Sequence, residues 1–311
     1  MKRIKLRRKG RKRLYQILLI AFFTLNILAY LGAYMLTHFS SPGQFGLGLS
    51  RPISSKLPTD LGLEYTTQRI QIARSEWLET WLIPVEKSTP RGTVILFPGN
   101  KGSKALQLLA PAQVFHSLGY DTLLVDFRGV GGSSGNTTTL GMREAQDVAV
   151  SVSYAQKSNL NRPLVLYGVS MGTSAILKAI ADEKINPDAL ILEVPFARLL
   201  DAVSSRVKAI SAPTFPLAEL IVFWGGIQHG FNGFIHNPVD YASQVKCPTL
   251  ILHGKLDKWT TVTEINGIFE NLPSSKQLSI FPNAGHDLLV TVDRKRWQQD
   301  IEKFLKSVEK G

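Results

Sequence analysis

Short, continuous runs of apolar residues recur along most of the chain, separated by stretches with helical spacing. Two early segments, 65–69 and 77–83, instead alternate apolar and polar residues and predict antiparallel strands. Continuous apolar strands between helices are typical of a mostly parallel sheet that is covered on both faces. The sequence therefore predicts an α/β fold. The continuous apolar runs are 92–97, 121–127, 164–167, 189–194, 249–253 and 277–281.

The N-terminal segment has a different pattern. Residues 14–36 contain no charged side chain, and this length is sufficient to cross a hydrocarbon core of about 30 Å. A cleaved signal peptide has a shorter apolar region that ends in small residues, and residues 34–39 offer no Ala-x-Ala site. We therefore expect an uncleaved signal anchor, with the cleaved signal as the alternative. Basic residues before the span place the N-terminus in the cytoplasm and the remainder on the extracytoplasmic side.

The net charge of +12 arises mostly from one short region. Residues 2–13 hold nine Lys or Arg and no acid, and without them the chain has 27 basic and 24 acidic residues. Because this arm directly precedes the apolar segment, it indicates membrane topology and argues against a nucleic-acid partner. The expected macromolecular contact is membrane lipid through residues 14–36. The single cysteine, Cys247, excludes an internal disulfide.

These patterns divide the chain into four parts. Residues 1–13 form a basic cytoplasmic arm and 14–36 a transmembrane signal anchor. A linker rich in Ser, Gly and Pro occupies 37–60, and one α/β domain occupies 61–311. Within that domain, residues 197–246 exceed the length of an ordinary crossover between strands, so we expect a small helical cap there.

The run that begins at Leu164 meets Gly-x-Ser-x-Gly and continues with helical character. A strand, a sharp turn and a helix are the context of a nucleophile elbow, in which the serine stands exposed above the sheet. Gly168 and Gly172 leave space where a Cβ would collide with a neighbouring strand or helix. Ser170 is therefore the candidate nucleophile.

A serine nucleophile needs a base and a group that orients the base. Asp257 follows the strand at 249–253, and His286 follows the last strand. Glu193, which ends the strand at 189–194, is the alternative acid. His253 is expected to be structural and Asp287 to face away from the site, and His116, His229 and His236 are expected to be surface or packing residues.

Four motifs, together with the order Ser170, Asp257, His286, resemble the α/β-hydrolase superfamily over residues 61–311. They are Asp-x-Arg-Gly-x-Gly-x-Ser from Asp126, the elbow, His-Gly-x-x-Asp, and Gly-His. Within the superfamily the chain looks most similar to membrane-anchored hydrolases of the ABHD13 and ABHD17 groups.

The resemblance implies the α/β-hydrolase fold and a role for each site residue. Ser170 attacks an acyl carbonyl, His286 accepts the proton, and Asp257 orients the imidazole. The backbone N–H groups of Met171 and Asn100 would form the oxyanion hole. The family's loop commonly begins His-Gly, whereas this chain has proline at position 98, and proline has no N–H to donate.

The cap contains the apolar run 217–224, which lies near the carboxyl ends of the strands where ligands bind in such sheets. Phe223 and Trp224 are therefore candidate acyl-pocket residues. The same run also fits the packed underside of the cap, or a segment that dips into the bilayer.

We expect a membrane-anchored serine hydrolase that cleaves an ester or thioester. The alternatives are an acyltransferase with the same triad, a serine peptidase, and a non-catalytic binding protein on this fold. The loop at 129–135 lacks the third glycine of a dinucleotide fingerprint, and no cluster has metal-ligand spacing, so no cofactor or metal is expected.

Overall fold

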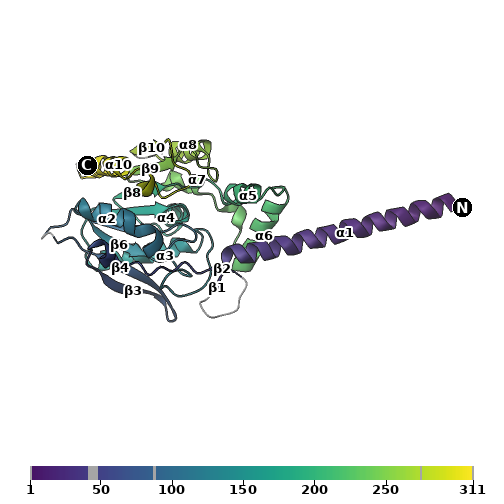
Figure 1. Cartoon of the computed structure of the whole chain (residues 1–311), viewed down its shortest axis with the longest axis horizontal. Coiled ribbons are helices and arrows are strands. Elements are labelled where there is room, and N and C mark those ends of the chain that lie inside the picture. Colours follow the sequence, from purple (N-terminus) through teal and green to yellow (C-terminus); the bar gives the residue numbers. More distant parts are fainter. Residues whose placement is uncertain (1, 41–47, 87–88, 274, 310–311) are drawn as a thin grey trace.

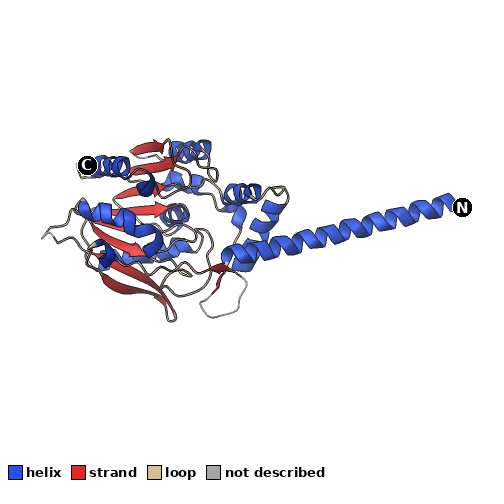
Figure 2. Cartoon of the chain, viewed as in Figure 1, coloured by secondary structure: helices blue, strands red, loops and turns tan. Residues whose placement is uncertain are grey.

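An eight-stranded sheet forms the middle layer of the structure, a computed structural model that describes residues 2–40, 48–86, 89–273 and 275–309 (Figures 1 and 2). Its strand order is β10-β9-β8-β7-β5-β6-β4-β3, and all neighbours are parallel except β3 with β4 and β4 with β6. The predicted α/β fold with a mostly parallel sheet is confirmed. The strands are β3 (Thr66–Ala73), β4 (Glu76–Ile83), β5 (Thr93–Phe97), β6 (Asp121–Val125), β7 (Leu164–Val169), β8 (Ala189–Glu193), β9 (Thr249–Gly254) and β10 (Lys276–Phe281).

Helices cover both faces of this sheet. Because side chains alternate along a strand, Ile95 joins the core beneath one layer of helices and Leu96 joins the core beneath the other. This double cover explains why β5 to β9 are apolar at almost every position. The first layer is α3 (Glu144–Lys157), α4 (Met171–Asp182) and α8 (Val262–Asn271), and the second is α2 (Leu109–Ser117) and α10 (Arg294–Val308).

The segment between β8 and β9 holds two helices with a small core of their own. Helices α5 (Leu199–Ala209) and α6 (Leu217–His229) pack together through Val203 and Val222. Further along, α7 (Pro238–Tyr241) packs instead against α4 and α8. The separate cap layer is therefore the α5–α6 pair. The remaining short elements are η1 (Pro58–Leu61), η2 (Lys104–Leu108), η3 (Gly233–Ile235), η4 (Ala242–Gln244) and α9 (Leu289–Val292).

One long helix, α1 (Lys2–Thr37), projects from the domain (Figure 1). It joins the predicted basic arm and the predicted span in one continuous element. Its part Gly10–Thr37 is long and apolar enough to cross a membrane, with a mean hydropathy of 2.0. The structure thus contains a helix with the length and composition of a membrane span.

The end of α1 is fastened to the domain by the segment that the sequence indicated as a linker. Of that segment, residues 41–47 lie outside the described residues. On either side of them, β1 (Phe39–Ser40) pairs in parallel with β2 (Leu49–Ser50). The Arg51 guanidinium then donates to the carbonyl oxygens of Gly131 and Gly135 at 3.0 Å each. These contacts join the base of α1 to the loop after β6.

Candidate active site

Ser170 lies in the sharp turn between β7 and α4. Its φ is 49°, a value that non-glycine residues rarely adopt, so the turn is strained. The two flanking glycines permit the strain: a Cβ on Gly168 would lie 2.7 Å from the backbone carbon of Gly172, and a Cβ on Gly172 would lie 2.6 Å from the Phe97 oxygen. The Ser170 N–H donates to the Glu193 carbonyl at 2.8 Å. The turn is therefore packed against both neighbouring strands.

Three side chains meet above this turn in a continuous hydrogen-bonded chain. Nε2 of His286 is 3.0 Å from Oγ of Ser170, and Nδ1 of His286 is 2.7 Å from Oδ2 of Asp257. Ser170 comes from the β7–α4 turn, Asp257 from the loop after β9, and His286 from the loop after β10. The structure thus brings together the three residues singled out from the sequence, in the geometry that activates a serine hydroxyl.

The Asp257 carboxylate is held in its ionised form. Burial raises its pKa, but the hydrogen bond and charge of His286 and two backbone donors outweigh burial and leave the pKa below its usual value. Those donors are the N–H groups of Trp259 and Thr260, at 2.7 and 3.0 Å from Oδ1. One oxygen thus remains for His286. An anion fixed in this way keeps a proton on Nδ1 and leaves Nε2 free to accept one.

The carboxylate of Glu193, the alternative acid, contacts residues other than His286. Its fully buried carboxylate accepts from the Tyr167 hydroxyl at 2.9 Å, the Trp297 indole at 2.7 Å and the Leu289 N–H at 2.7 Å. Burial raises its pKa to about 7, although these three donors act in the opposite direction. Because Leu289 follows the loop of His286, Glu193 fastens that loop to the sheet.

Other polar candidates near the site have structural contacts. His253 is fully buried, with Nδ1 3.9 Å from Oδ2 of Asp257, and burial lowers its pKa. Asp287 accepts from the Gly285 N–H at 2.9 Å and so shapes the turn that carries His286. His236 is buried beside Ser174, with Nε2 2.9 Å from its hydroxyl.

The loop after β5 lies against the nucleophile. A Cβ on Gly99 would lie 3.4 Å from Cβ of Ser170, so the loop is in van der Waals range of the nucleophile. The Gly99 N–H already donates to Oε1 of Gln107 at 2.7 Å. Asn100 is the next residue with an N–H, and Met171 opens α4, whose first N–H groups lack helical acceptors. Gln107, which the motifs did not indicate, fixes the orientation of this loop.

The Asp-x-Arg-Gly-x-Gly-x-Ser motif also holds the loop after β5, through hydrogen bonds of Asp126. Oδ1 of buried Asp126 accepts from the Lys104 N–H at 2.7 Å, and Oδ2 accepts from the Gly132 N–H at 3.0 Å. The Lys104 ammonium binds Asp126 and also reaches Glu79 at 2.9 Å. This buried ion pair thus links the loop after β5 to the loop after β6.

A cation lies beside the hydrogen-bonded chain. The Arg206 guanidinium of α5 stacks 4.3 Å from the centre of the Trp259 ring, which in turn stacks on His286. Burial lowers the pKa of Arg206 to about 10, although the charge of Asp257 acts in the opposite direction. Within the described part of the chain, no carboxylate lies within 4 Å of this guanidinium. Arg206 therefore places a positive charge beside Trp259, close enough for Asp257 to act on its pKa.

Phe223 and Trp224, the residues predicted for an acyl pocket, lie on the surface and against α1 respectively. The Trp224 indole donates to Oδ1 of Asn26 in α1 at 3.2 Å, and Phe223 is 46% exposed. An apolar crevice does lie between α1, α5 and α6, but neither residue lines it. Its lining includes Ala33, Leu36, Leu140, Leu199, Val203 and Ile221.

Comparison with family models divides the chain into two matched parts. Residues 88–222 match a family described as serine aminopeptidase, S33. Residues 233–311 match one described as PhoPQ-activated pathogenicity-related protein. The first match contains Ser170, and the second contains Asp257 and His286.

Two relatives illustrate the similarity to characterised and uncharacterised proteins. The uncharacterised protein YqkD of Bacillus subtilis is 28% identical over 203 residues, which are 64% of this chain and 67% of YqkD. The lysophosphatidylserine lipase ABHD12 of Xenopus tropicalis is 26% identical over 199 residues, or 58% of this chain. The match spans 46% of that lipase, about half its length.

Solved structures share the fold. The Pyrococcus furiosus esterase Pf2001 superposes with a TM-score of 0.70 at 22% identity, covering 83% of this chain and 96% of the esterase. Est1E of Butyrivibrio proteoclasticus, solved with ferulic acid, gives 0.61 at 17% identity and covers 78% of this chain and all of that one. These superpositions establish the architecture.

Proposed function

We propose that the chain is a membrane-anchored serine hydrolase of the α/β-hydrolase superfamily that cleaves an ester or thioester through an acyl-enzyme on Ser170. The family model matched by residues 88–222, the lipase relatives and the fold shared with esterases support an esterase-like hydrolase. The observation that carries this proposal is the continuous chain from Ser170 through His286 to Asp257, with contacts of 3.0 and 2.7 Å. The narrower likeness to the ABHD13 and ABHD17 groups stays a prediction.

In the proposed reaction, Oγ of Ser170 attacks the acyl carbonyl while Nε2 of His286 accepts its proton. Asp257 holds the imidazole and stabilises the imidazolium that forms. Negative charge on the former carbonyl oxygen is stabilised by the N–H groups of Met171 and Asn100. His286 then returns the proton to the leaving alcohol or thiol, and water attacks the acyl-enzyme by the reverse route.

The charge beside the site supports a substrate with an anionic group. Arg206 lies next to Trp259 without a carboxylate partner of its own, so a phosphate or carboxylate on the substrate finds a donor there. The ABHD12 relatives are named lysophosphatidylserine lipases, and lysophosphatidylserine is an acyl ester with an anionic headgroup. We propose this chemical class, an anionic acyl ester, for the present chain.

The serine aminopeptidase description of residues 88–222 suggests a second activity. An aminopeptidase must bind the positively charged α-amino group of its substrate, which a carboxylate does best. Here the Arg206 cation stacks 4.3 Å from the centre of the Trp259 ring. Repulsion between like charges therefore favours an anionic ester over a peptide with a free amino end.

The orientation in the membrane follows from the basic residues before the span. We propose that α1 is a signal anchor, with residues 1–13 in the cytoplasm and the domain at 61–311 on the extracytoplasmic side. The helix Gly10–Thr37 supports this proposal by its length and hydropathy.

Turnover of a water-soluble short-chain ester by the purified full chain in detergent tests the catalytic proposal. We expect the wild type to hydrolyse the ester and Ser170→Ala to be inactive. Ser174→Ala is the matched control, because this serine lies one turn further along α4 and its hydroxyl contacts His236 instead of His286. Hydrolysis by Ser170→Ala at the wild-type rate would refute the proposal.

A further inference from the structure

Helix α6 packs across α1 at a defined position along the axis of α1. A Cβ on Gly32 would lie 3.9 Å from Ile221, and a Cβ on Gly225 would lie 3.8 Å from Cβ of Ala33. Both distances are in the van der Waals range, so the two helices pack directly against each other at these small residues. The crossing therefore involves Gly32 and Ala33 of α1 and the middle of α6. Figure 1 shows α6 beside α1 where the long helix leaves the domain.

The height of this crossing can be related to the bilayer. A span needs about 20 apolar residues, and such a stretch that begins at Leu14, directly after the basic arm, ends at Ala33. If α1 crosses the membrane as proposed above, the crossing with α6 thus lies at the boundary of the hydrocarbon core, on the side of the domain. This is the depth at which helices that lie in a membrane interface are found.

One side chain of α6 extends further along α1. The Trp224 indole donates to Asn26, seven positions before Ala33 and therefore about 10 Å deeper at 1.5 Å per residue. It also packs edge-on against Tyr30, with ring centres 5.6 Å apart. Asn26 is one of the few polar residues of the proposed span, and a buried amide in hydrocarbon requires a partner. Trp224 provides one.

The opposite face of α6 is apolar and uncovered. Phe223 and Ile227 lie one turn apart on this face and are 46% and 60% exposed, and Phe215 just before the helix is 76% exposed. Neighbouring residues of α1 at the same height, Leu28 and Leu31, are exposed as well. Among the 13 residues of α6, Glu219 alone carries a formal charge. Lipid acyl chains are the expected contact of an exposed apolar face that is continuous with a membrane span.

We propose that α6 is inserted into the leaflet on the side of the domain, with Phe223 and Ile227 against acyl chains and Trp224 at the depth of Asn26. The proposal rests on the membrane anchoring proposed for α1, and it adds that the cap itself enters the bilayer. The catalytic domain is thereby held in the membrane by two elements, α1 and α6.

Fluorescence quenching by lipid measures this insertion. The full chain is reconstituted into dioleoylphosphatidylcholine vesicles that contain phosphatidylcholine brominated at a chosen position of the acyl chain. The chain has five tryptophans, and we expect bromine to quench a component that is lost in Trp224→Phe. Trp77→Phe is the matched control, since the Trp77 indole donates to the Gly132 carbonyl oxygen within the domain, and should leave that component unchanged.

A variant that regains lipid quenching shows that a loss of quenching in Trp224→Phe does not come from misfolding. Ile227→Trp in the Trp224→Phe background should restore lipid quenching, whereas Lys303→Trp in the same background should not, because Lys303 is exposed on α10. If the chain stays with the vesicles after an alkaline wash but Trp224→Phe is quenched like the wild type and Ile227→Trp restores nothing, insertion of α6 is refuted and the anchor stands. If the wash removes the chain, the anchor proposal itself fails, and insertion of α6 fails with it.

Discussion

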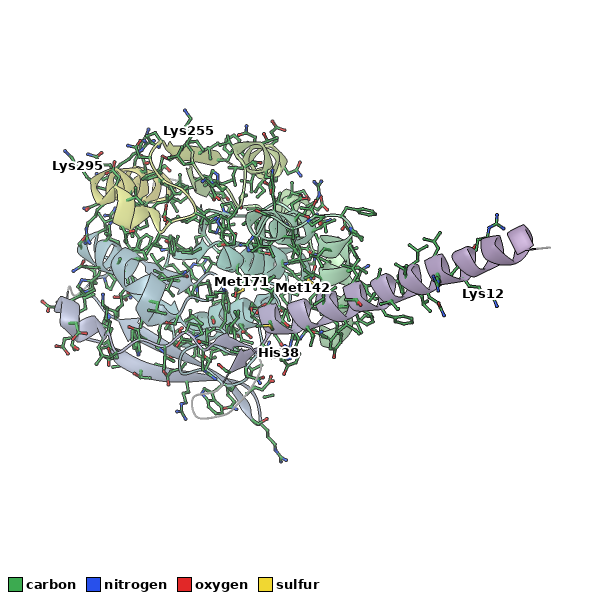
Figure 3. The ribbon with its side chains drawn as sticks, turned by 45° about the vertical axis from the view of Figure 1, so that its right-hand side comes forward. Lys12, His38, Met142, Met171, Lys255 and Lys295 are labelled. Carbon is green, nitrogen blue, oxygen red and sulfur yellow. The ribbon has the colours of Figure 1, made fainter. Side chains whose placement is uncertain are left out.

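The backbone N–H of Thr138 donates to the carbonyl oxygen of Thr37, the last residue of α1, at 2.8 Å. The hydroxyl of Thr138 also lies 3.2 Å from Sδ of Met171, the residue after the candidate nucleophile. The base of the long helix is therefore only two contacts away from the candidate active site. Figure 3 shows Met171 and His38 on the side of the domain from which α1 departs.

The first prediction separates the two candidate acids. Asp257→Asn should fold but lose about 10⁴ in kcat, because an asparagine favours the wrong tautomer of His286. Glu193→Gln should lower kcat far less, since Glu193 contacts Leu289 and not His286. Steady-state kinetics and melting curves of both variants provide the comparison. A larger loss of kcat in Glu193→Gln would move the acid to β8.

The second prediction concerns the loop after β5. Gln107→Ala removes the acceptor of the Gly99 N–H and frees this loop to shift. We expect kcat to fall by about 10- to 100-fold with little change in KM, because the misplaced donors stabilise the transition state less well. Gln113→Ala, on the helix α2 that directly follows η2, is the control. Equal kinetics for the two variants would show that Gln107 does not position the loop.

A third prediction tests the charge beside the site. For an anionic ester, Arg206→Gln should lower kcat/KM by about 10- to 100-fold, the effect of one lost charged hydrogen bond. For a neutral ester of the same acyl chain it should change little. Arg198→Gln is the control, since Arg198 begins the same helix and pairs loosely with Asp201 at 3.9 Å. A uniform loss on both substrates would assign Arg206 to the packing of Trp259.

The fourth prediction concerns stability and pH. The folded state raises the pKa of Glu193 from 4.5 to about 7, so it binds the proton more tightly than the unfolded state does. The contribution of the protonated group is therefore present below pH 4.5 and is lost as the pH rises to about 7, by up to about 3 kcal/mol.

Burial also lowers the pKa of His236 to about 4 and raises that of Asp147 to about 7, so both groups add to the pH dependence of stability. Only a comparison of the wild type with a Glu193 variant isolates the contribution of Glu193. The gap in Tm between the wild type and Glu193→Gln should narrow from pH 5 to pH 7.5. A gap that widens with pH would contradict the raised pKa.

The fifth prediction concerns topology. A C-terminal reporter that is active only outside the cytoplasm should be active when fused to the full chain. Replacing the basic residues between positions 2 and 13 by glutamine should reduce that activity, because they retain the N-terminus in the cytoplasm. A soluble product trimmed near residue 36 would instead identify a cleaved signal.

The sequence was informative wherever one strand determines the position of a residue. Because parallel strands end at one edge of the sheet, residues that follow β7, β9 and β10 converge there, and Ser170, Asp257 and His286 could be identified together. Arg206 could not, since its position depends on how the cap packs above β9. For Trp224 the apolar run offered three interpretations, and only the contact with Asn26 distinguishes an α1 neighbour from a pocket residue.

The most direct test of the account is labelling of the full chain by a fluorophosphonate, which reacts with activated serines. We predict a single adduct that mass spectrometry locates on Ser170, no adduct in Ser170→Ala, and an unchanged adduct in Ser174→Ala, whose serine lies one turn further along α4 and contacts His236. Full labelling of Ser170→Ala, or no labelling of the wild type, would contradict the assignment of Ser170 as the nucleophile.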